Sequence, residues 1–388
     1  MGEDRRLTYV CDWLPPDFGA VGQYSVQFAR EYAERDGRHV TLVGLTSGTP
    51  QVTTETLGRG TLKIVRLAAA PVPKDRLWRR MIWTLHTNLR LLATIIGRTP
   101  LGGALLFTGS PPFLLLFIGP FKWLLGYRLT YRITDFYPEC LMVTMERVPW
   151  PLRLLYRVTV FLRRRVDSFQ VMGEDQRRRL RKIGIDDRRI VVKRDPSPVA
   201  FSASTRPLPR PRGAGDSVLL LYSGNYGVAH EIDTFVEGYI RHHRDGNGRV
   251  LLWLNASGSG AAEVVERLRA ADCPVILGKT VPLKDLASLL VTPDAHLITL
   301  KDRFVGLVMP SKVYGCVESG RDVLFIGSTD SDVELITRTR AQPGQRYLQV
   351  PVGDIDGVAR ALDALGAATG ARHGTAGRAP AVVLGSQE

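Results

Sequence analysis

Apolar and polar positions along the chain predict an alternation of strands and helices. Short apolar runs at residues 7–11, 39–45 and 62–67 have strand length, and a helical pattern ending at Glu34 separates the first two. This β-loop-α-β rhythm is typical of the start of a doubly wound parallel sheet. Further strands are predicted at residues 104–108, 127–133 and 191–195, and further helices at residues 74–96, 112–125 and 150–166.

A second rhythm of the same kind follows a segment rich in Pro, Ser, Gly and Arg at residues 196–215, which is interpreted as a linker. Strands are predicted at residues 217–222, 250–254, 275–277, 295–299 and 322–326. Helices are predicted at residues 231–243, 261–270, 283–291, 311–319 and 354–367. The pattern therefore predicts Rossmann-like domains at 1–195 and 216–353, a C-terminal helix at 354–367 and a disordered tail at 368–388.

Residues 99–121 carry no charge and could be mistaken for a membrane span. Glycines and prolines interrupt the stretch repeatedly, so a strand, a turn and a helix packed inside the first domain explain it better. The start of the chain runs directly into the first strand, so no signal peptide is expected.

Charge is distributed unevenly between the two halves. The chain has 388 residues, a net charge of +14 and 44% apolar residues. Residues 1–195 hold 32 Lys and Arg against 18 Asp and Glu, whereas residues 196–388 hold 20 of each, so the excess of +14 lies in the first half. A one-sided basic surface suggests nucleic acid, anionic lipid or an anionic acceptor. The four cysteines lack metal-ligand spacing, so no metal site is expected and reduced thiols of a cytoplasmic protein are the default.

The two basic helices of the first half are amphipathic. In the helix at 74–96 a stripe of apolar residues recurs at helical spacing: Trp78, Met81, Ile82, Leu85, Leu89, Leu92 and Ile96. The helix at 150–166 mixes aromatics with arginines, and a third basic cluster lies at residues 177–182. Such helices are suited to the headgroup region of a membrane, although apolar faces that pack on the sheet would give the same pattern. The residues expected to face a membrane are Trp78, Arg79, Arg80, Trp83, Arg163, Arg164 and Arg165.

Three glycine-bearing turns, at residues 19–22, 223–227 and 306–312, follow strands and precede helices. Each can aim backbone N–H groups at an anion, although glycine also serves turn geometry alone. None matches GxGxxG or GxxxxGK[ST], which argues against a standard dinucleotide fold and a P-loop NTPase. No GxSxG or HExxH occurs either.

The motifs YSGNYGVAHE at 222–231 and VMPSKVYGCVESGRDVLFIG at 308–327 resemble the donor domain of family 4 retaining glycosyltransferases. The motifs DFGAVGQY at 17–24 and TDFYPE at 134–139 are similar to the WbuB-like branch of bacterial cell-surface polysaccharide enzymes, which includes N-acetyl-fucosamine transferases. The resemblance covers about residues 7–365. It implies an α/β fold of the GT-B type, with two facing Rossmann-like doubly wound domains and the active site in the cleft between them.

The resemblance also implies roles for individual residues. Lys312 would offset charge on the leaving nucleoside diphosphate, with a solvated lysine at a helix start as the alternative. Glu318 would accept the ribose hydroxyls, or it is a plain surface residue. The full set of expected donor-binding residues is Gly19, Gly22, Gly224, Asn225, Lys301, Pro310, Ser311, Lys312 and Glu318. Gly19 and Gly22 are expected beside the donor diphosphate or the acceptor.

The chain departs from the wider family at a pair of glutamates, where it carries Leu307 and Gly315. Val228 stands where the branch tends to have Arg, and Lys301 or Arg303 is a possible substitute cation. Catalytic roles are expected for three residues. Asp135 and Glu139 follow the strand at 127–133, where they could orient an acceptor hydroxyl or act as base; the alternative is a helix N-cap at Asp135. His230 could touch the donor, or it has a capping or core role.

The sequence therefore predicts a metal-independent glycosyltransferase without a cofactor, of hexosyl or N-acetylhexosaminyl type. It would use a nucleotide sugar, expected to be a UDP-sugar, and a lipid-linked or glycan acceptor such as a polyprenyl-diphosphate glycan. The protein would bind peripherally to the inner face of the cell membrane through anionic lipid. No nucleic-acid partner is expected. Two alternatives stay open: a UDP-sugar 2-epimerase of the same fold, and a catalytically inactive membrane-binding scaffold.

Overall fold

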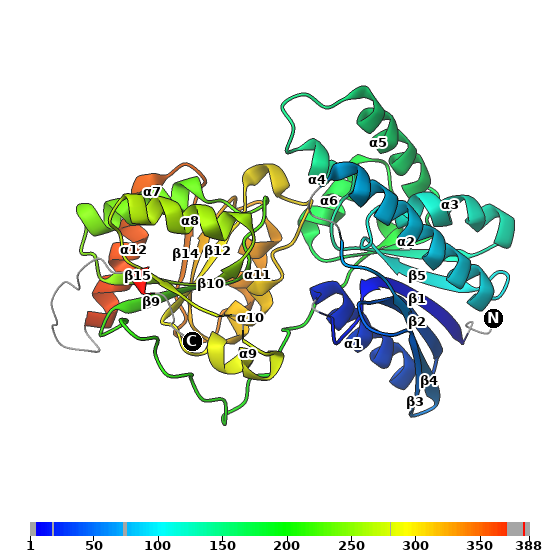
Figure 1. The fold of residues 1–388 in the computed structure, drawn as a ribbon, viewed down its shortest axis with the longest axis horizontal. Coiled ribbons are helices and arrows are strands. Elements are labelled where there is room, and N and C mark those ends of the chain that lie inside the picture. The colour runs from blue at the N-terminus through cyan, green and yellow to red at the C-terminus, as the bar shows by residue number, and fades with distance from the viewer. Residues whose placement is uncertain (1–4, 18, 73–75, 280, 371–382, 385–388) are drawn as a thin grey trace. The chain divides into compact units, whose positions relative to one another are not determined.

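A computed structural model describes residues 5–17, 19–72, 76–279, 281–370 and 383–384. The chain forms two compact units. The first comprises Met1–Pro196 together with the short segment Gly306–Met309, and the second comprises Ser197–Val305 and Pro310–Glu388. Figure 1 shows that each unit is a central sheet covered by helices.

The first unit contains an eight-stranded sheet in the order β3-β4-β2-β1-β5-β6-β7-β8. Its strands are β1 (Arg6–Trp13), β2 (His39–Thr46), β3 (Gln51–Leu57), β4 (Gly60–Ala68), β5 (Ala104–Thr108), β6 (Arg128–Ile133), β7 (Ser168–Val171) and β8 (Ile190–Val192). All neighbours pair in parallel except β3 and β4, which form an antiparallel hairpin. The chain runs from β1 outward to β2 and β4, then returns to β5 on the other side of β1, so β1 and β5 flank the point where the strand order reverses.

Helices cover both faces of this sheet. They are α1 (Ala20–Glu34), α2 (Leu77–Arg98), α3 (Leu114–Leu125), α4 (Glu139–Met142), α5 (Trp150–Arg163) and α6 (Glu174–Lys182), with a 3-10 turn η1 (Asp187–Arg189). Because right-handed crossovers in opposite directions place their helices on opposite faces, α1 and α3 belong to different faces. In Figure 1, α2 and α3 lie side by side, and α3 packs in turn on α5.

The second unit contains a seven-stranded parallel sheet in the order β14-β13-β12-β9-β10-β11-β15. Its strands are β9 (Val218–Asn225), β10 (Val250–Ser257), β11 (Val275–Leu277), β12 (Ala295–Thr299), β13 (Asp322–Ile326), β14 (Tyr347–Val350) and β15 (Val383–Leu384). Its helices are α7 (Asp233–Arg244), α8 (Ser259–Ala270), α9 (Leu283–Leu290), α10 (Lys312–Glu318), α11 (Asp332–Arg340) and α12 (Ile355–Gly370), with the 3-10 turn η2 (Asp302–Phe304). The order reverses between β9 and β12.

Most predicted strands and helices are confirmed, including β5 and α3 in the uncharged stretch at 99–121. Among the described residues no helix is long and apolar enough to cross a membrane. Segments that were not predicted include β3, β7, α6, α11 and β14. The predicted strand at 191–195 is shorter and earlier, because Asp195 leaves the sheet to form a buried ion pair with Arg132, whose Nη2 lies 2.6 Å from Asp195 Oδ1.

Two predicted boundaries differ or fall outside the described residues. The prediction of a disordered tail at 368–388 is wrong for the residues of the tail that the structure describes. There, α12 continues to Gly370, and β15 pairs with β11. The remainder of that tail, and Lys74 at the predicted start of α2, lie outside the described residues.

Candidate functional site

The carboxyl ends of β9 and β12 lie at the reversal point of the second sheet, where open α/β sheets bind ligands. His230 follows β9 and its Nδ1 lies 2.8 Å from the carbonyl oxygen of Thr299, the last residue of β12. The backbone N–H of Lys301 donates to the carbonyl of Ala229 at 2.9 Å. These two contacts join the loops after β9 and β12 and bring His230 and Lys301, both predicted site residues, together.

An aromatic cluster surrounds His230. The rings of Tyr222 and Tyr226 stack with centroids 4.0 Å apart, and the imidazole meets both edge-on. Burial is the main cause that lowers the pKa of His230 to about 3, and the positive charges of Lys312 and Lys301 add to it. A neutral ring beside a carbonyl acceptor carries its proton on Nδ1, so Nε2 is left as a hydrogen-bond acceptor.

Lys312, the first residue of α10, lies beside this cluster. Its Nζ is 3.2 Å from the centre of the Tyr222 ring and has no hydrogen-bond partner among the described residues. Burial lowers the pKa of Lys312 to about 7. A buried ammonium group without a carboxylate partner suits an anion that arrives from solution.

The glycine loop after β9 has the backbone freedom that its sequence suggested. Gly224 adopts a φ of +113°, which favours glycine, and Gly224 and Asn225 are exposed at the strand end. Pro310 and Ser311 precede Lys312, with Pro310 buried. These predicted donor-site residues therefore belong to loops at the same sheet edge as His230.

Sequence reasoning missed a further loop at this edge, between β10 and α8. A Cβ on Gly258 would lie 2.5 Å from Asn225 Oδ1, and the N–H of Gly260 donates to the Tyr226 carbonyl at 3.1 Å. The signal was present in the sequence: Gly258 follows a strand and precedes a helix, as in the three turns that were recognised, and Gly260 lies in the first turn of that helix.

The structure places Glu318 away from the predicted donor site. It ends α10, six residues and about 9 Å along the helix axis from Lys312. The hydroxyl of the next residue, Ser319, contacts His296 near the start of β12. Glu318 therefore lies toward the amino edge of the sheet, away from His230, and does not belong to this site.

The positions of the family's missing glutamates are packed interior positions. Leu307 is buried, and a Cβ on Gly315 would lie 2.9 Å from Leu290 Cδ1. Glutamate at Gly315 would need the helix to shift. Val228, at the position where Arg is more usual, is exposed.

In the first unit, Asp135 follows β6 at the carboxyl edge of the sheet. Pro138, and not Asp135, is the N-cap of α4, and no side chain caps that helix. Burial is the main cause that raises the pKa of Asp135 to about 6, and the charge of Asp12 adds to it. The structure thus leaves Asp135 available for chemistry.

The structure does not fit the predicted catalytic role of Glu139. Arg163 Nη1 and Nη2 donate to its two carboxylate oxygens at 2.5 and 3.0 Å, and both side chains are buried. Nη2 also donates to the Tyr137 carbonyl at 2.7 Å. The carboxylate is already paired with a guanidinium, so Glu139 holds α4 against α5 and is not a free base.

Gly19 and Gly22 shape the start of α1. Gly19 is the N-cap residue, and a Cβ on Gly22 would lie 1.7 Å from the carbonyl oxygen of Trp13. Gly22 is therefore required by close packing of α1 on the end of β1, whatever else it contacts.

The apolar stripe of α2 faces outward. Trp78 is 53% exposed, and most of the stripe shares this exposure, while polar Asn88 is fully buried and donates to the Pro112 carbonyl. Leu92 is the exception, packed inside with Leu91 and Ile95. The exposed stripe members are Trp78, Met81, Ile82, Leu85, Leu89 and Ile96. The interpretation that these side chains pack on the sheet is therefore wrong.

Helix α5 shows the same arrangement. Trp150 is 75% exposed, and Leu154, Val158 and Phe161 continue an outward apolar stripe. Exposed Arg164 and Arg165 lie at its end, with Arg165 over the Phe161 ring at 4.6 Å. On α2, Arg79 lies over the Trp78 ring at 5.5 Å, and Arg80 is exposed. We call these two exposed stripes with their arginines the apolar-basic face.

Two of the residues predicted to face a membrane do not belong to the apolar-basic face. Arg163 is 0% exposed, because it forms the ion pair with Glu139. Trp83 is half-buried: its Nε1 donates to the Ala70 carbonyl at 2.8 Å, and its ring stacks on Trp13. Trp83 therefore anchors α2 to the chain beneath it.

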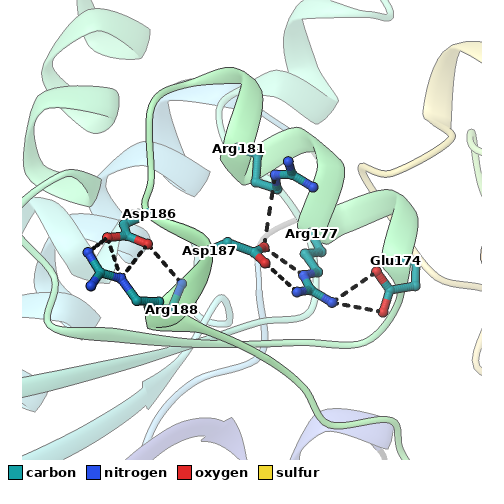
Figure 2. A network of polar contacts seen from close by, with 6 residues as sticks. All are labelled: Glu174, Arg177, Arg181, Asp186, Asp187 and Arg188. Atoms are coloured by element: carbon teal, nitrogen blue, oxygen red, sulfur yellow. Dashed lines mark hydrogen bonds and ion pairs between the residues drawn. The ribbon is translucent and has the colours of Figure 1, made fainter.

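The third basic cluster, at residues 177–182, is partly neutralised by its neighbours. Figure 2 shows Arg177 between Glu174 and Asp187, with Arg181 also approaching Asp187. Arg188 pairs with Asp186 in the same network. The pairs of Arg177 and Arg181 with Asp187 fasten α6 to η1, so the cluster contributes less free positive charge than its sequence suggests.

The described residues hold no group of three or more His, Cys, Asp or Glu side chains that could bind a metal ion. All four cysteines are buried free thiols.

No protein-family model matches the chain. A probable glycosyltransferase of Pseudomonas aeruginosa, WbjE, is 21% identical over 344 residues, which cover 85% of this chain and 83% of that protein. Among solved structures, a trehalose-6-phosphate protein from E. coli bound with UDP-2-fluoro glucose has a TM-score of 0.61 at 13% identity, covering 94% of both chains. The lipopolysaccharide outer core galactosyltransferase WaaB has a TM-score of 0.55 at 11% identity, covering 94% of this chain and 90% of that one. The chain therefore has the GT-B fold of these structures, and its sequence is similar to that of a glycosyltransferase.

Proposed function

We propose that the chain is a glycosyltransferase of the WbuB-like kind that moves a sugar from a nucleoside-diphosphate sugar to a membrane-linked acceptor. The observation that carries the proposal is Lys312, a buried cation with no hydrogen-bond partner among the described residues, at the reversal point of the second sheet. The similarity to WbjE and the GT-B fold support the reaction class. UDP is the favoured nucleotide, because a structural neighbour binds a UDP-sugar.

The proposed transfer reaction requires the second unit to stabilise a leaving nucleoside diphosphate. The bond between the anomeric carbon and the diphosphate oxygen breaks, and its electron pair stays on the diphosphate. Lys312 places a positive charge where that negative charge grows, and the loops at Gly224 and Gly258 allow close backbone approach. We propose that transfer retains the anomeric configuration, that the sugar is of hexosyl or N-acetylhexosaminyl type, and that no metal is required.

The acceptor half of the proposal rests on the apolar-basic face. Exposed tryptophans flanked by arginines match the pattern of helices that lie in the headgroup region. The excess of +14 in residues 1–195 would attract anionic lipid, at about 1 kcal/mol for each basic residue near the surface. We propose peripheral binding to the inner face of the cell membrane, where a polyprenyl-diphosphate glycan would be within reach.

Isothermal titration with UDP, GDP and their sugars tests the donor half. Saturable UDP binding that Lys312→Ala abolishes, while Lys284→Ala at an exposed lysine of the same unit does not, is the expected result. Lack of binding to any nucleotide, or equal binding by both variants, would overturn the proposal. Incubation with nucleotide sugars, membrane extract and EDTA, followed by mass spectrometry and NMR of the product, then tests acceptor, metal requirement and anomeric outcome.

A further inference from the structure

The ring of Tyr222 lies directly against the ammonium group of Lys312. Tyr222 belongs to β9, is fully buried, and forms part of the apolar core of the second unit. Lys312 Nζ lies 3.2 Å from the ring centre, and the Tyr226 ring stacks on Tyr222 with centroids 4.0 Å apart. An ammonium group and a second ring at these distances cannot share one face. Lys312 and Tyr226 therefore occupy opposite faces of the Tyr222 ring.

Hydrogen bonds hold the two stacked rings in place. The Tyr222 hydroxyl donates to the Asn225 carbonyl at 3.2 Å, and the Tyr226 hydroxyl donates to the Glu231 carbonyl at 2.9 Å. A buried phenol that packs on a second ring and donates its proton to a carbonyl has little freedom to turn. The ring face that Lys312 contacts is therefore fixed before any ligand binds.

No carboxylate forms an ion pair with Lys312 among the described residues. The titratable groups near enough to interact with its charge are Cys316, His230 and His296. Burial raises the pKa of Cys316 to about 12, and burial is the main cause that lowers the pKa of His230 to about 3 and of His296 to about 4. All three groups are therefore uncharged near pH 7, and the ring face is the favourable electrostatic contact that remains for the ammonium.

Lys193 of the first unit makes a useful contrast. Its Nζ also lies over aromatic rings, 4.4 Å from the centres of Phe28 and Tyr32. It lies in addition 3.7 Å from the Glu31 carboxylate and donates to the Tyr32 hydroxyl at 3.2 Å. Lys312 thus has the ring contact without the counter-ion. A carboxylate partner would compete with an incoming diphosphate, whereas a ring face leaves the charge of the ammonium group unneutralised.

We propose that Tyr222 is a positioning residue that holds the Lys312 ammonium group at the sheet edge through a cation–π contact, in place of a counter-ion. The negative face of the ring stabilises the protonated lysine at a buried position, where an unassisted ammonium group would lose its proton more readily. The charge is then available to a nucleoside diphosphate without an ion pair that has to break first. The consequence for nucleotide binding rests on the proposed function, whereas the contact itself needs no ligand.

The first measurement uses the ligand-free protein labelled with ¹³C,¹⁵N-lysine. The side-chain signals of Lys312, assigned by their loss in Lys312→Met, are expected upfield of those of exposed Lys284, because the ring current shields a group above an aromatic face. Tyr222→Phe keeps the ring, so it should keep both this shift and the pH at which Lys312 titrates. Tyr222→Leu should lose the shift and titrate at lower pH, because the ring no longer opposes the effect of burial.

The wild-type spectrum tests the contact even where Tyr222→Leu does not fold. Lys312 signals that are not shifted upfield in the wild type would overturn the inference. A titration of Lys312 in folded Tyr222→Leu at the same pH as in the wild type, or at a higher pH, would also overturn it.

Isothermal titration with UDP tests the consequence for binding. Phe235→Leu is the matched control for lost packing, because Phe235 is a buried ring of the same core that packs on Tyr239. At about pH 7.5, Tyr222→Leu is expected to weaken UDP binding by about tenfold, and Tyr222→Phe and Phe235→Leu by less than about twofold. The loss in Tyr222→Leu should shrink at about pH 6, where more of the lysine is protonated.

The outcomes separate this inference from the proposed function. Equal losses of UDP affinity in Tyr222→Leu and Phe235→Leu, with no dependence on pH, would assign Tyr222 to packing alone and overturn the inference. Failure of the proposed function looks different: the wild type would then not bind UDP, while the upfield signals of Lys312 and their dependence on the Tyr222 ring would remain.

Discussion

Arg163 and Glu139 form a bidentate ion pair inside the first unit, with Arg163 fully buried. The guanidinium also lies over the Phe136 ring at 5.0 Å and so contacts the chain immediately after Asp135. Removal of one partner of such a pair leaves an uncompensated buried charge, whereas removal of both does not. The pair therefore fixes the short α4 segment and, with it, the place of Asp135.

Arg163→Met and Glu139→Leu are each expected to lower the free energy of unfolding by about 3–5 kcal/mol. The double variant is expected to lose clearly less than the sum of the two, because no buried charge remains unpaired. Urea denaturation of the four proteins measures this coupling. Arg164→Met, next along the chain but exposed, is the matched control and is expected to change stability by less than about 0.5 kcal/mol. Additive losses in the double variant would contradict the prediction.

The sequence predicts the interior strands well, because buried parallel strands such as β12 are continuous apolar runs. It misses β3, whose alternating polar residues belong to an exposed edge hairpin. It also identifies the apolar stripe of α2 without its direction. Helical periodicity tells which residues share a face, but only the packing of Asn88 and Leu91 shows which face is inside.

The candidate sites divide in the same way. Lys312 and His230 lie in or next to glycine-bearing turns that the sequence shows. Asp12 lies within an apolar strand, and its local sequence does not show that it accepts a hydrogen bond from Ser110, 98 residues away. Glu139 and Arg163 are misread for a related reason: a carboxylate and an arginine on separate helices give no sign that they neutralise each other. Pairings between distant segments are a property of the fold and not of local spacing.

Lys312 is expected to destabilise the ligand-free protein. Its pKa of about 7 in the folded chain lies below the ordinary value of 10.5, so the unfolded chain binds more protons between these values. The contribution of Lys312 to stability therefore becomes less unfavourable as pH rises from about 7 to about 10.5. Lys312→Met is expected to raise the free energy of unfolding by about 1–3 kcal/mol at neutral pH, with a gain that shrinks toward pH 10.5.

Urea titrations of wild type and Lys312→Met at several pH values test this prediction, with Lys284→Met as the exposed control. The same linkage predicts that binding of an anionic diphosphate favours the charged lysine. UDP binding above pH 7 should therefore take up a proton, which calorimetry in buffers of different ionisation enthalpy detects. A stability gain that does not vary with pH would show that Lys312 is not the titrating group.

His230 is expected to remain neutral throughout the working pH range. Burial and the neighbouring lysines lower its pKa to about 3, so a kinetic limb near pH 6.5 should not come from this residue. In ¹⁵N-histidine spectra its ring is expected to show the Nδ1–H tautomer from pH 5 to pH 8, because Nδ1 faces the Thr299 carbonyl. His230→Ala should lower kcat/KM by about tenfold or more through loss of an acceptor at Nε2. A ring that becomes protonated between pH 5 and 8 would contradict this account.

The apolar-basic face leads to a prediction about membrane binding. Trp78 on α2 and Trp150 on α5 present large exposed rings on two separate helices of the first unit. Burial of one such side chain in the headgroup region contributes about 1.5–3 kcal/mol, so Trp78→Glu and Trp150→Glu should each weaken binding to vesicles with anionic lipid by about tenfold or more. Leu283→Glu, at a half-exposed leucine of the second unit, is the matched control and should bind as the wild type does.

Flotation with anionic and neutral vesicles at low and high salt separates the two contributions, because salt screens the arginines but not the tryptophans. Wild-type protein that floats with neither vesicle would remove the membrane from the proposed function and leave the donor site untouched.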